Sequence, residues 1–358
     1  MSKVAVFVGT RPEIIKMQPV MRALSDKRRS LNTILVHTGQ HYDANMSDTI
    51  MEDVGLPKPD IFLGVGSATQ GVQTAKIISR VEEVLMKERP DLVLVLGDTN
   101  SVLGTALAAS KLRIAVGHIE AGCRSHDRTM TEELNRVVIS DLGSLHFAPT
   151  KNCRNNLIHE GISREAIHLV GHPLVDLLIP LMGRTDKLPD GLGHLARRQF
   201  CFSTLHREEN VDEKGTLRSI LAGLQKVSRQ LPLVIALHPR TAKRIKEWEL
   251  ARYLDGIIVK GPVSYLESLK LIRNARIVLT DSGGIQQEAY LLSTPCLTLR
   301  DRTEWIETVE AGVNFLSSPP MIPENAKRVS EHFDTIEKRF ESSGDAFGRP
   351  MLSIRMSE

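Results

Sequence analysis

The chain alternates from end to end between short runs of Val, Ile and Leu and longer segments whose apolar residues recur at helical spacing. Short continuous apolar runs separated by helices are typical of a parallel sheet covered on both faces. The pattern predicts an α/β fold with two similar lobes of six strands each. The first lobe is expected to have strands at 4–8, 33–37, 92–96, 114–118, 145–148 and 167–170. The second is expected to have them at 200–204, 233–237, 257–259, 277–280, 296–299 and 313–316.

The first helix is predicted by its capping residues as well as by its spacing. Thr10 has Glu13 three residues later, which is a capping-box arrangement, and Pro12 stands in the first turn, where its missing N–H costs little. We therefore expect a helix that packs one face on the sheet. The residues of that face recur at helical spacing and are Ile14, Met17, Met21 and Leu24.

Length and turn-forming residues predict two domains. The chain has 358 residues, near twice the common domain size of roughly 100 to 200 residues. Residues 178–198 carry two prolines, three glycines and mixed charges, which is typical of a linker. We place a hinge at 172–198, between an N-terminal domain at 1–171 and a C-terminal domain at 199–338.

Composition narrows the function classes. Apolar residues make up 41% and charged residues 25%, and the net charge of +3 is too balanced for a nucleic-acid binder or a membrane-surface protein. The chain opens with a strand-like run, and no stretch of about 20 apolar residues occurs, so we expect neither secretion nor a membrane span. The cysteines are far apart in sequence and form no C-x-x-C pair, which favours a reduced, cytoplasmic protein without a disulfide framework or a zinc knuckle. They are Cys123, Cys153, Cys201 and Cys296.

Polar clusters follow five of the predicted strands directly. In open parallel sheets, ligands bind beyond the carboxyl ends of the strands, so these clusters are the candidate binding residues. They lie at 9–13, 97–99, 119–122, 206–210 and 281–284, with Lys16 one turn beyond the first.

The turn Ser282-Gly283-Gly284 is the most interpretable cluster by itself. Its glycines let the backbone approach a ligand, and the N–H groups of the following helix favour an anion such as a diphosphate. Glu288, about one turn into that helix, can reach a ribose. The alternative is a glycine-rich turn that holds no ligand. A dinucleotide fingerprint is absent, since Thr69 stands where the third glycine would follow Gly64 and Gly66, and hydride chemistry loses support.

Asp98, Glu120 and Glu132 are carboxylates that the strand order can bring together. Two or more acids near one carbon are what proton removal and return require. Each also has a plain structural interpretation. Asp98 can cap the helix that follows it, and Glu132 with Arg136 can form an i,i+4 ion pair.

Two histidines each follow a predicted strand and have an arginine beside them. His206 precedes Arg207, and His238 stands two residues before Arg240. A histidine in such a place is often structural, but the adjacent arginine favours phosphate contact. The histidines lack metal-ligand spacing, so no metal site is expected.

Several ordered motifs together resemble the non-hydrolysing UDP-N-acetylglucosamine 2-epimerases. The resemblance runs from residue 3 to about residue 315, in order and at family spacing. Its motifs are Gly9-Thr10-Arg11-Pro12-Glu13-Ile14-Ile15-Lys16, Gln40-His41-Tyr42, Gly97-Asp98-Thr99, Gly117-His118-Ile119-Glu120-Ala121-Gly122, Glu132-Glu133-Leu134-Asn135-Arg136, His206-Arg207, Asp281-Ser282-Gly283-Gly284-Ile285-Gln286 and Arg300-Asp301-x-Thr303-Glu304.

The resemblance implies a GT-B-type fold of two Rossmann-like doubly wound parallel-sheet lobes, with the active site in the cleft between them. It implies a nucleotide-binding C-terminal domain, and a segment at 339–358 that packs back on the N-terminal domain. It also implies interconversion of UDP-GlcNAc and UDP-ManNAc without NAD or metal, usually in a homodimer.

Residue roles are carried over by motif. The resemblance makes Asp98, Glu120 and Glu132 the catalytic acids, with Arg136 and His206 close by. Glu288 is expected at the ribose, and His238 is a further candidate for substrate binding. Contacts to the diphosphate are expected from Arg11, Lys16, Arg207, Ser282, Gly283 and Gly284.

The chain departs from the family pattern at named positions. Trp305 and Ile306 stand where many members have Arg-Pro, and this form resembles the branch acting on UDP-2,3-diacetamido-2,3-dideoxyglucuronate, although the opening Gly-Thr-Arg-Pro-Glu does not. Glu208 replaces a frequent Arg, and Gln287 replaces a frequent Glu. Asp43 replaces the last Gln of a segment that binds an activating second UDP-GlcNAc in some members, so weak or absent activation is expected.

Other functions stay open beside the epimerase. A glycosyltransferase of the same fold would need an acceptor, and a nucleotide-sugar binding protein would not turn its ligand over. The sequence leaves open the substituents at C3 and C6 of the sugar.

Overall fold

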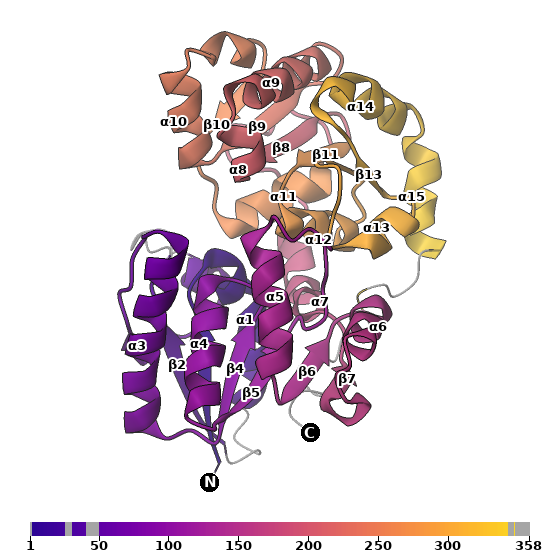
Figure 1. The fold of residues 1–358 in the computed structure, drawn as a ribbon. Helices are drawn as coiled ribbons and strands as arrows, with labels where there is room; N and C mark the ends of the chain where they lie inside the picture. The colour runs from indigo at the N-terminus through magenta and orange to yellow at the C-terminus, as the bar shows by residue number, and fades with distance from the viewer. Residues whose placement is uncertain (1, 26–30, 41–49, 343–346, 348–358) are drawn as a thin grey trace. The chain divides into compact units, whose positions relative to one another are not determined.

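The computed structural model describes residues 2–25, 31–40, 50–342 and 347. The described chain forms two compact units. Unit 1 contains the described residues up to Pro180 together with Phe347, and unit 2 contains residues 181–342. Each unit is built on its own parallel sheet (Figure 1).

Unit 1 has a seven-stranded sheet in the order β3-β2-β1-β4-β5-β6-β7, and all its strand pairs are parallel. The strands are β1 (Lys3–Val8), β2 (Asn32–His37), β3 (Ile61–Phe62), β4 (Leu92–Leu96), β5 (Ala115–Ile119), β6 (Leu145–Ala148) and β7 (Ile167–Leu169). The helices are α1 (Arg11–Leu24), α3 (Gln70–Glu88), α4 (Asn100–Lys111), α5 (Thr131–Leu142), α6 (Lys151–His159) and α7 (Pro173–Leu181). Helices α3, α4 and α5 lie side by side along the sheet (Figure 1).

Unit 2 has a six-stranded parallel sheet in the order β10-β9-β8-β11-β12-β13. The strands are β8 (Cys201–Leu205), β9 (Leu233–Leu237), β10 (Ile258–Lys260), β11 (Ile277–Thr280), β12 (Cys296–Thr298) and β13 (Asn314–Leu316). The helices are α8 (Glu208–Val211), α9 (Lys214–Ser228), α10 (Pro239–Glu247), α11 (Tyr265–Asn274), α12 (Gly283–Leu291), α13 (Ile306–Glu310), α14 (Ile322–Glu331) and α15 (Phe333–Ser342).

The two sheets confirm the predicted α/β architecture with two parallel-sheet lobes. Every predicted strand is present, with ends that differ by at most one or two residues. The expectation of six strands in the first lobe is wrong, because β3 adds a seventh. This strand has only two residues, Ile61 and Phe62, which is too short for a hydrophobic pattern to mark.

Strand order reverses once in each sheet, and the reversals fix where ligands can bind. In unit 1 the chain moves outward from β1 to β3 and returns to place β4 beside β1. In unit 2 the same reversal puts β11 beside β8. Ligand sites of open α/β sheets form beyond the strand ends at such points.

The start of α1 differs from the predicted capping box. Thr10 is the N-cap residue, but its side chain makes no capping hydrogen bond. The Glu13 carboxylate instead accepts the Gly9 N–H at 2.6 Å and the Thr99 hydroxyl at 2.6 Å. The capping prediction is therefore wrong for this pair, because Glu13 ties the end of β1 to the turn after β4.

Candidate active site

Asp98 follows β4 and is held by a buried guanidinium. Arg136 of α5 donates from Nε to Asp98 Oδ2 at 2.8 Å, and its Nη2 lies 2.5 Å from the same oxygen. The Nη1 of Arg136 binds Glu133 at 2.9 Å. The capping interpretation of Asp98 is wrong, since Thr99 is the N-cap of α4 and accepts the Val102 N–H.

Glu120 stands directly after β5 in a left-handed backbone conformation, with φ of 64°. Its Oε1 accepts from Lys16 Nζ at 2.6 Å and from His172 Nε2 at 2.5 Å. Burial would raise the pKa of Glu120, but Lys16 and His172 outweigh it and lower the pKa to about 2. Glu120 is therefore an ionised, buried carboxylate at neutral pH.

Asp98 and Glu120 follow the ends of two paired strands. Strands β4 and β5 pair in register, with Leu96 opposite Ile119, so the residues that follow emerge side by side. A Cβ at Gly97 would lie 3.8 Å from Glu120 Oε2. The structure thus brings two of the three predicted acids to neighbouring strand ends in unit 1.

Glu132 and Arg11 occupy helix starts in unit 1. Glu132 is half-buried in the first turn of α5, and Arg136 lies one turn further along the same helix. Arg11 is the first residue of α1 and is half-buried. Lys16, expected at the diphosphate, is buried and paired with Glu120 in this structure.

His172 belongs to this site and was missed from the sequence. Its Nδ1 accepts the Leu174 N–H at 3.2 Å, so Nε2 carries the proton that it donates to Glu120. Burial lowers the pKa of His172, which favours this neutral form. The signal that selected His206 and His238, a histidine just after a predicted strand, would have found it.

Glu13 is a second buried carboxylate that was not selected. Its hydrogen bonds come from the neutral Gly9 N–H and Thr99 hydroxyl. Burial raises its pKa to about 7, against the lowering effect of these donors. Near neutral pH Glu13 is therefore partly protonated, whereas Glu120 is ionised.

In unit 2, the fully buried Asp281 organises the turn after β8. Its carboxylate accepts the backbone N–H groups of His206 and Arg207 and the side-chain amide of Asn210 at 3.0 to 3.2 Å. His206 Nδ1 lies 3.2 Å from Asp281 Oδ1, while 39% of the His206 side chain stays exposed. Burial would raise the pKa of Asp281, but His206, Arg207 and Asn210 outweigh it and lower the pKa.

The turn Ser282-Gly283-Gly284 has the geometry expected at a helix N-terminus. Ser282 is the N-cap of α12 and accepts the Ile285 N–H at 3.4 Å. A Cβ on Gly283 would lie 2.5 Å from Glu304 Oε1, so a larger residue here would displace the Glu304 carboxylate. A Cβ on Gly284 would meet only the Ser282 hydroxyl, at 3.8 Å, so there is space beside this second glycine.

A carboxylate and two arginines surround that turn. Glu304 is buried and binds Arg300 at 3.1 Å, and Arg207 Nη2 lies 3.7 Å from Glu304. The sequence singled out Glu304 as part of a motif but gave it no place in the site. Glu288 is buried on α12, in the helix that the turn begins.

His238 has a structural role and also lies near His206. It is the N-cap of α10, and its Nδ1 accepts the Arg240 N–H at 3.2 Å. The two histidine rings are 5.9 Å apart between centroids. Arg240 binds the carboxylates of Asp212 and Glu208 in this structure.

Two predictions concern segments that are only partly described. His41, Tyr42 and Asp43 lie outside the described residues, whereas Gln40 is buried and accepts the Ser101 N–H at 2.7 Å. Of the C-terminal segment beyond residue 342, the structure describes Phe347.

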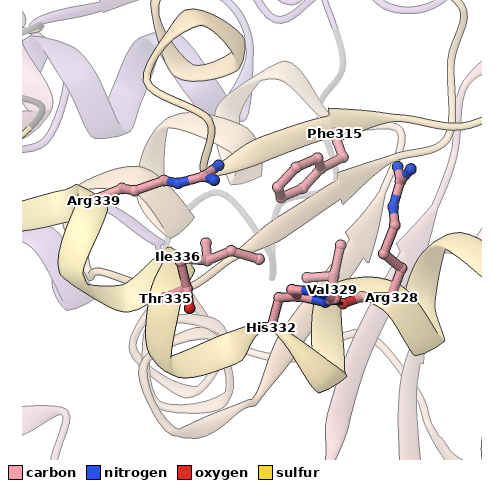
Figure 2. Close-up of a pocket in the computed structure, with 7 residues that line it drawn as sticks. All are labelled: Phe315, Arg328, Val329, His332, Thr335, Ile336 and Arg339. Atoms are coloured by element: carbon pink, nitrogen blue, oxygen red, sulfur yellow. Dashed lines mark hydrogen bonds between the residues drawn. The ribbon is translucent and has the colours of Figure 1, made fainter.

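A separate pocket in unit 2 contains none of the predicted site residues. Its volume is about 180 Å³, and Figure 2 shows its apolar and basic lining. The lining residues are Phe315, Arg328, Val329, His332, Thr335, Ile336 and Arg339.

The described part of the chain has no group of three or more His, Cys, Asp and Glu side chains placed to hold a metal ion. None of the helices described combines the length and apolar character that crossing a bilayer requires.

The chain belongs to the UDP-N-acetylglucosamine 2-epimerase family, a family of isomerases, since the family model matches residues 23–356. A UDP-N-acetylglucosamine 2-epimerase of Methanocaldococcus jannaschii is 44% identical over 323 residues, which is 88% of each chain. A UDP-2,3-diacetamido-2,3-dideoxy-D-glucuronate 2-epimerase of Pseudomonas aeruginosa is 39% identical over 361 residues, covering 99% of this chain and 98% of that one. The resemblance noted from the motifs is therefore confirmed.

Solved structures of the family match the whole fold. The M. jannaschii UDP-GlcNAc 2-epimerase in complex with UDP-GlcNAc and UDP has a TM-score of 0.86 at 40% identity, covering 99% of this chain and 98% of that one. The Neisseria meningitidis UDP-GlcNAc 2-epimerase bound to UDP-GlcNAc has a TM-score of 0.87 at 30% identity, with the same coverage.

Proposed function

We propose that this protein interconverts UDP-GlcNAc and UDP-ManNAc by eliminating UDP and adding it back. The observation that carries the proposal is the pair Asp98 and Glu120 at neighbouring strand ends, one held by Arg136 and the other kept ionised by Lys16 and His172. Relatives of the same family are named UDP-N-acetylglucosamine 2-epimerase, and two structures of the family hold UDP-GlcNAc.

Proton chemistry at C2 explains why several acids are needed. The C2 hydrogen of an N-acetyl sugar has no adjacent carbonyl, so a base alone removes it poorly. Loss of UDP from C1 gives oxocarbenium character that acidifies C2, and a carboxylate takes the proton to leave 2-acetamidoglucal. A proton then returns from another acid to the opposite face, and UDP adds back to C1. We assign these transfers to Asp98, Glu120 and Glu132.

Unit 2 supplies the groups proposed to hold UDP. The N–H groups at the start of α12 and the hydroxyl of Ser282 suit the diphosphate, and Arg207 and His206 add donors beside them. Glu288 is proposed to bind the ribose, with His238 as a further contact. Arg11 and Lys16 of unit 1 are proposed to complete the contacts to the diphosphate when substrate binds.

Solvent exchange at C2 tests the reaction. Carboxylates in contact with water exchange their protons quickly, so epimerisation in D2O without NAD should place deuterium at C2 of the product. NMR of the product measures this directly, with Glu120→Gln as the control protein. Complete epimerisation with the original hydrogen kept at C2 would exclude the proposed route.

The diacetamido uronate analogue is a second candidate substrate. It is the substrate in the name of the P. aeruginosa relative, which aligns with 99% of this chain. Trp305 is buried, and its indole Nε1 would lie 3.4 Å from a Cβ on Gly283, so the distinguishing residue sits at the turn proposed to bind diphosphate. Incubation with each UDP-sugar, followed by NMR of the products, decides between them. Turnover without an acceptor would also argue against a glycosyltransferase or a binding protein.

Assembly and location are part of the same proposal. We expect a homodimer that acts in the cytoplasm, with no nucleic-acid partner and no cofactor. Light scattering on the purified protein measures the mass, and a monomer at assay concentrations would contradict the dimer.

A further inference from the structure

Phe347 makes two contacts with a residue of the proposed site. Its carbonyl accepts the His172 backbone N–H at 2.8 Å, and its ring lies 5.5 Å from the His172 ring between centroids. Only 1% of Phe347 is exposed. A residue near the C-terminus is therefore part of the packing around His172, although 175 positions separate the two in the chain.

His172 has contacts at its backbone and at its ring, and each contact helps to orient the ring for its hydrogen bond to Glu120. The Phe347 carbonyl fixes its backbone, and the Leu174 N–H binds Nδ1. With Nδ1 occupied, Nε2 carries the hydrogen and donates it to Glu120 Oε1. A shift of His172 would therefore change the environment of Glu120 directly.

We propose that Phe347 is a positioning residue for Glu120, acting through His172. This role rests on the proposed function, because it assumes that Glu120 handles the C2 proton. The ring of Phe347 covers one side of His172 and its carbonyl holds the backbone, so the hydrogen bond to Glu120 stays short and shielded from water. Supporting residues of this kind keep a functional side chain in its working geometry.

Several titratable groups act on Glu120, and the test must separate His172 from the others. They are Lys16 from α1, His172 from the residue before α7, His118 from β5 and Cys123 just beyond β5. Lys16 and His172 are the two that hydrogen-bond the carboxylate. Loss of the His172 contact leaves Lys16 in place, so the pKa of Glu120 should rise only part of the way to its ordinary value.

The experiment compares Phe347→Leu and Phe347→Ala with Phe347→Tyr, which keeps the ring. The readout is kcat and KM for deuterium incorporation at C2 between pH 3.5 and pH 7. We expect Phe347→Leu and Phe347→Ala to lower kcat at pH 7 about tenfold, with KM changed less than twofold. A Glu120 pKa that rises but stays below 4.5 changes the ionised fraction mainly below pH 5. The ratio of kcat at pH 5 to kcat at pH 3.5 should therefore rise about twofold over wild type, while Phe347→Tyr restores the wild-type ratio.

Two further variants separate positioning from general destabilisation. Phe333→Ala removes a buried aromatic ring of unit 2 that packs on Arg198 and Arg276, and it should leave the pH ratio unchanged. Adding Phe347→Leu to His172→Gln should lower kcat no further than His172→Gln alone, because both changes act through one contact.

Three results would overturn the inference. Folded Phe347→Leu protein with the wild-type pH ratio would do so, and so would the same altered ratio in Phe333→Ala. Wild-type protein that exchanges no C2 proton would overturn the proposed function and remove this role with it. If wild-type protein incorporates deuterium at C2 but Phe347→Leu keeps the wild-type pH ratio of kcat, only the positioning role is overturned.

Discussion

At the scale of single residues, two buried glutamates of unit 1 show how partners decide protonation. Burial raises the pKa of both carboxylates. Glu120 has Lys16 and His172 beside it and stays ionised, whereas Glu13 accepts from neutral donors and reaches a pKa of about 7. Environments that give two carboxyl groups very different pKa values are typical of sites that transfer protons.

Replacing Glu13 tests its raised pKa through stability. Between its unfolded pKa near 4.5 and its folded pKa near 7, the unfolded chain releases this proton while the folded protein keeps it. Stability should therefore be full below pH 4.5 and fall as pH rises through 7, by on the order of 3 kcal/mol. Glu13→Gln resembles the protonated acid, so its melting temperature should exceed wild type at pH 8 and match it at pH 4.5. Equal melting temperatures at both pH values would contradict this.

Replacing the proposed acids tests their role in turnover. Asp98→Asn, Glu120→Gln and Glu132→Gln should each lower kcat by roughly 10² or more, since positioned acid-base groups contribute about that much. Circular dichroism should show the wild-type fold in each variant. Near-normal turnover in all three would end the assignment.

Residue-level prediction worked where a residue directly follows a strand. Asp98, Glu120, His206 and Ser282 were all selected by this rule, and the structure places them at strand ends. The prediction that Glu13 forms a capping box with Thr10 was wrong. A capping box is a pattern within one helix start, whereas Glu13 binds the Thr99 hydroxyl, which follows another strand. Hydrogen bonds between elements cannot be read from spacing along one element.

At the scale of elements, the turn after β5 packs tightly on the start of α6. Gly122 has φ of 84°, and a Cβ there would lie 2.1 Å from the Cys153 carbonyl oxygen. The thiols of Cys123 and Cys153 lie 3.3 Å apart, although 30 positions separate them in sequence. This contact fixes the segment that leads away from Glu120.

Alanine at Gly122 should therefore destabilise the protein strongly. Gly161 has φ of 90°, and no atom lies within 4 Å of the position of a Cβ there. Alanine at Gly161 therefore measures the cost of the left-handed backbone alone, without a steric clash. Gly161→Ala should cost about 1 to 2 kcal/mol for the left-handed conformation. Gly122→Ala should cost about 1 to 3 kcal/mol more, since its methyl group also collides with backbone. Urea unfolding of both variants measures the difference, and equal losses would show that the close approach is unimportant.

Element prediction succeeded for apolar runs of three residues or more and failed for the two-residue strand β3. Strands such as β4 are buried on both faces, so their pattern is nearly continuous Val and Leu. Strand β3 has two residues and a half-exposed Phe62, so it pairs with β2 without leaving a pattern. Helix α7 occupies the start of the predicted hinge, and Pro180 lies near its end.

At the scale of the whole molecule, the two units share one strand order without a visible sequence repeat. In each, the chain reverses beside its first strand, and the selected residues follow strands at that reversal or next to it. The alternation of strands and helices was sufficient to predict this architecture. The sugar substituents leave no comparable pattern, because they depend on the shape around a few side chains.

Weakening the proposed UDP contacts should make the intermediate escape. His206→Ala and Arg207→Ala leave the carboxylates of unit 1 intact while removing donors from the diphosphate. We expect UDP and 2-acetamidoglucal to accumulate faster, relative to epimerisation, than in wild type. Lys243→Ala, which removes an exposed lysine of α10, is the matched control. Chromatography of the products gives the ratio, and an unchanged ratio in both alanine variants would count against the elimination route.

The contact between His172 and Phe347 also sets an order of events during protein synthesis. Ribosomes add about 5 to 20 residues per second, so Phe347 is added roughly 10 to 35 s after His172. The strands of unit 1 and Lys16, which also binds Glu120, are translated long before Phe347. A newly made chain therefore passes through a stage in which the strands of unit 1 can pair while the packing around His172 is still incomplete. The packing that holds His172 against Glu120 is then completed only once residue 347 has left the ribosome.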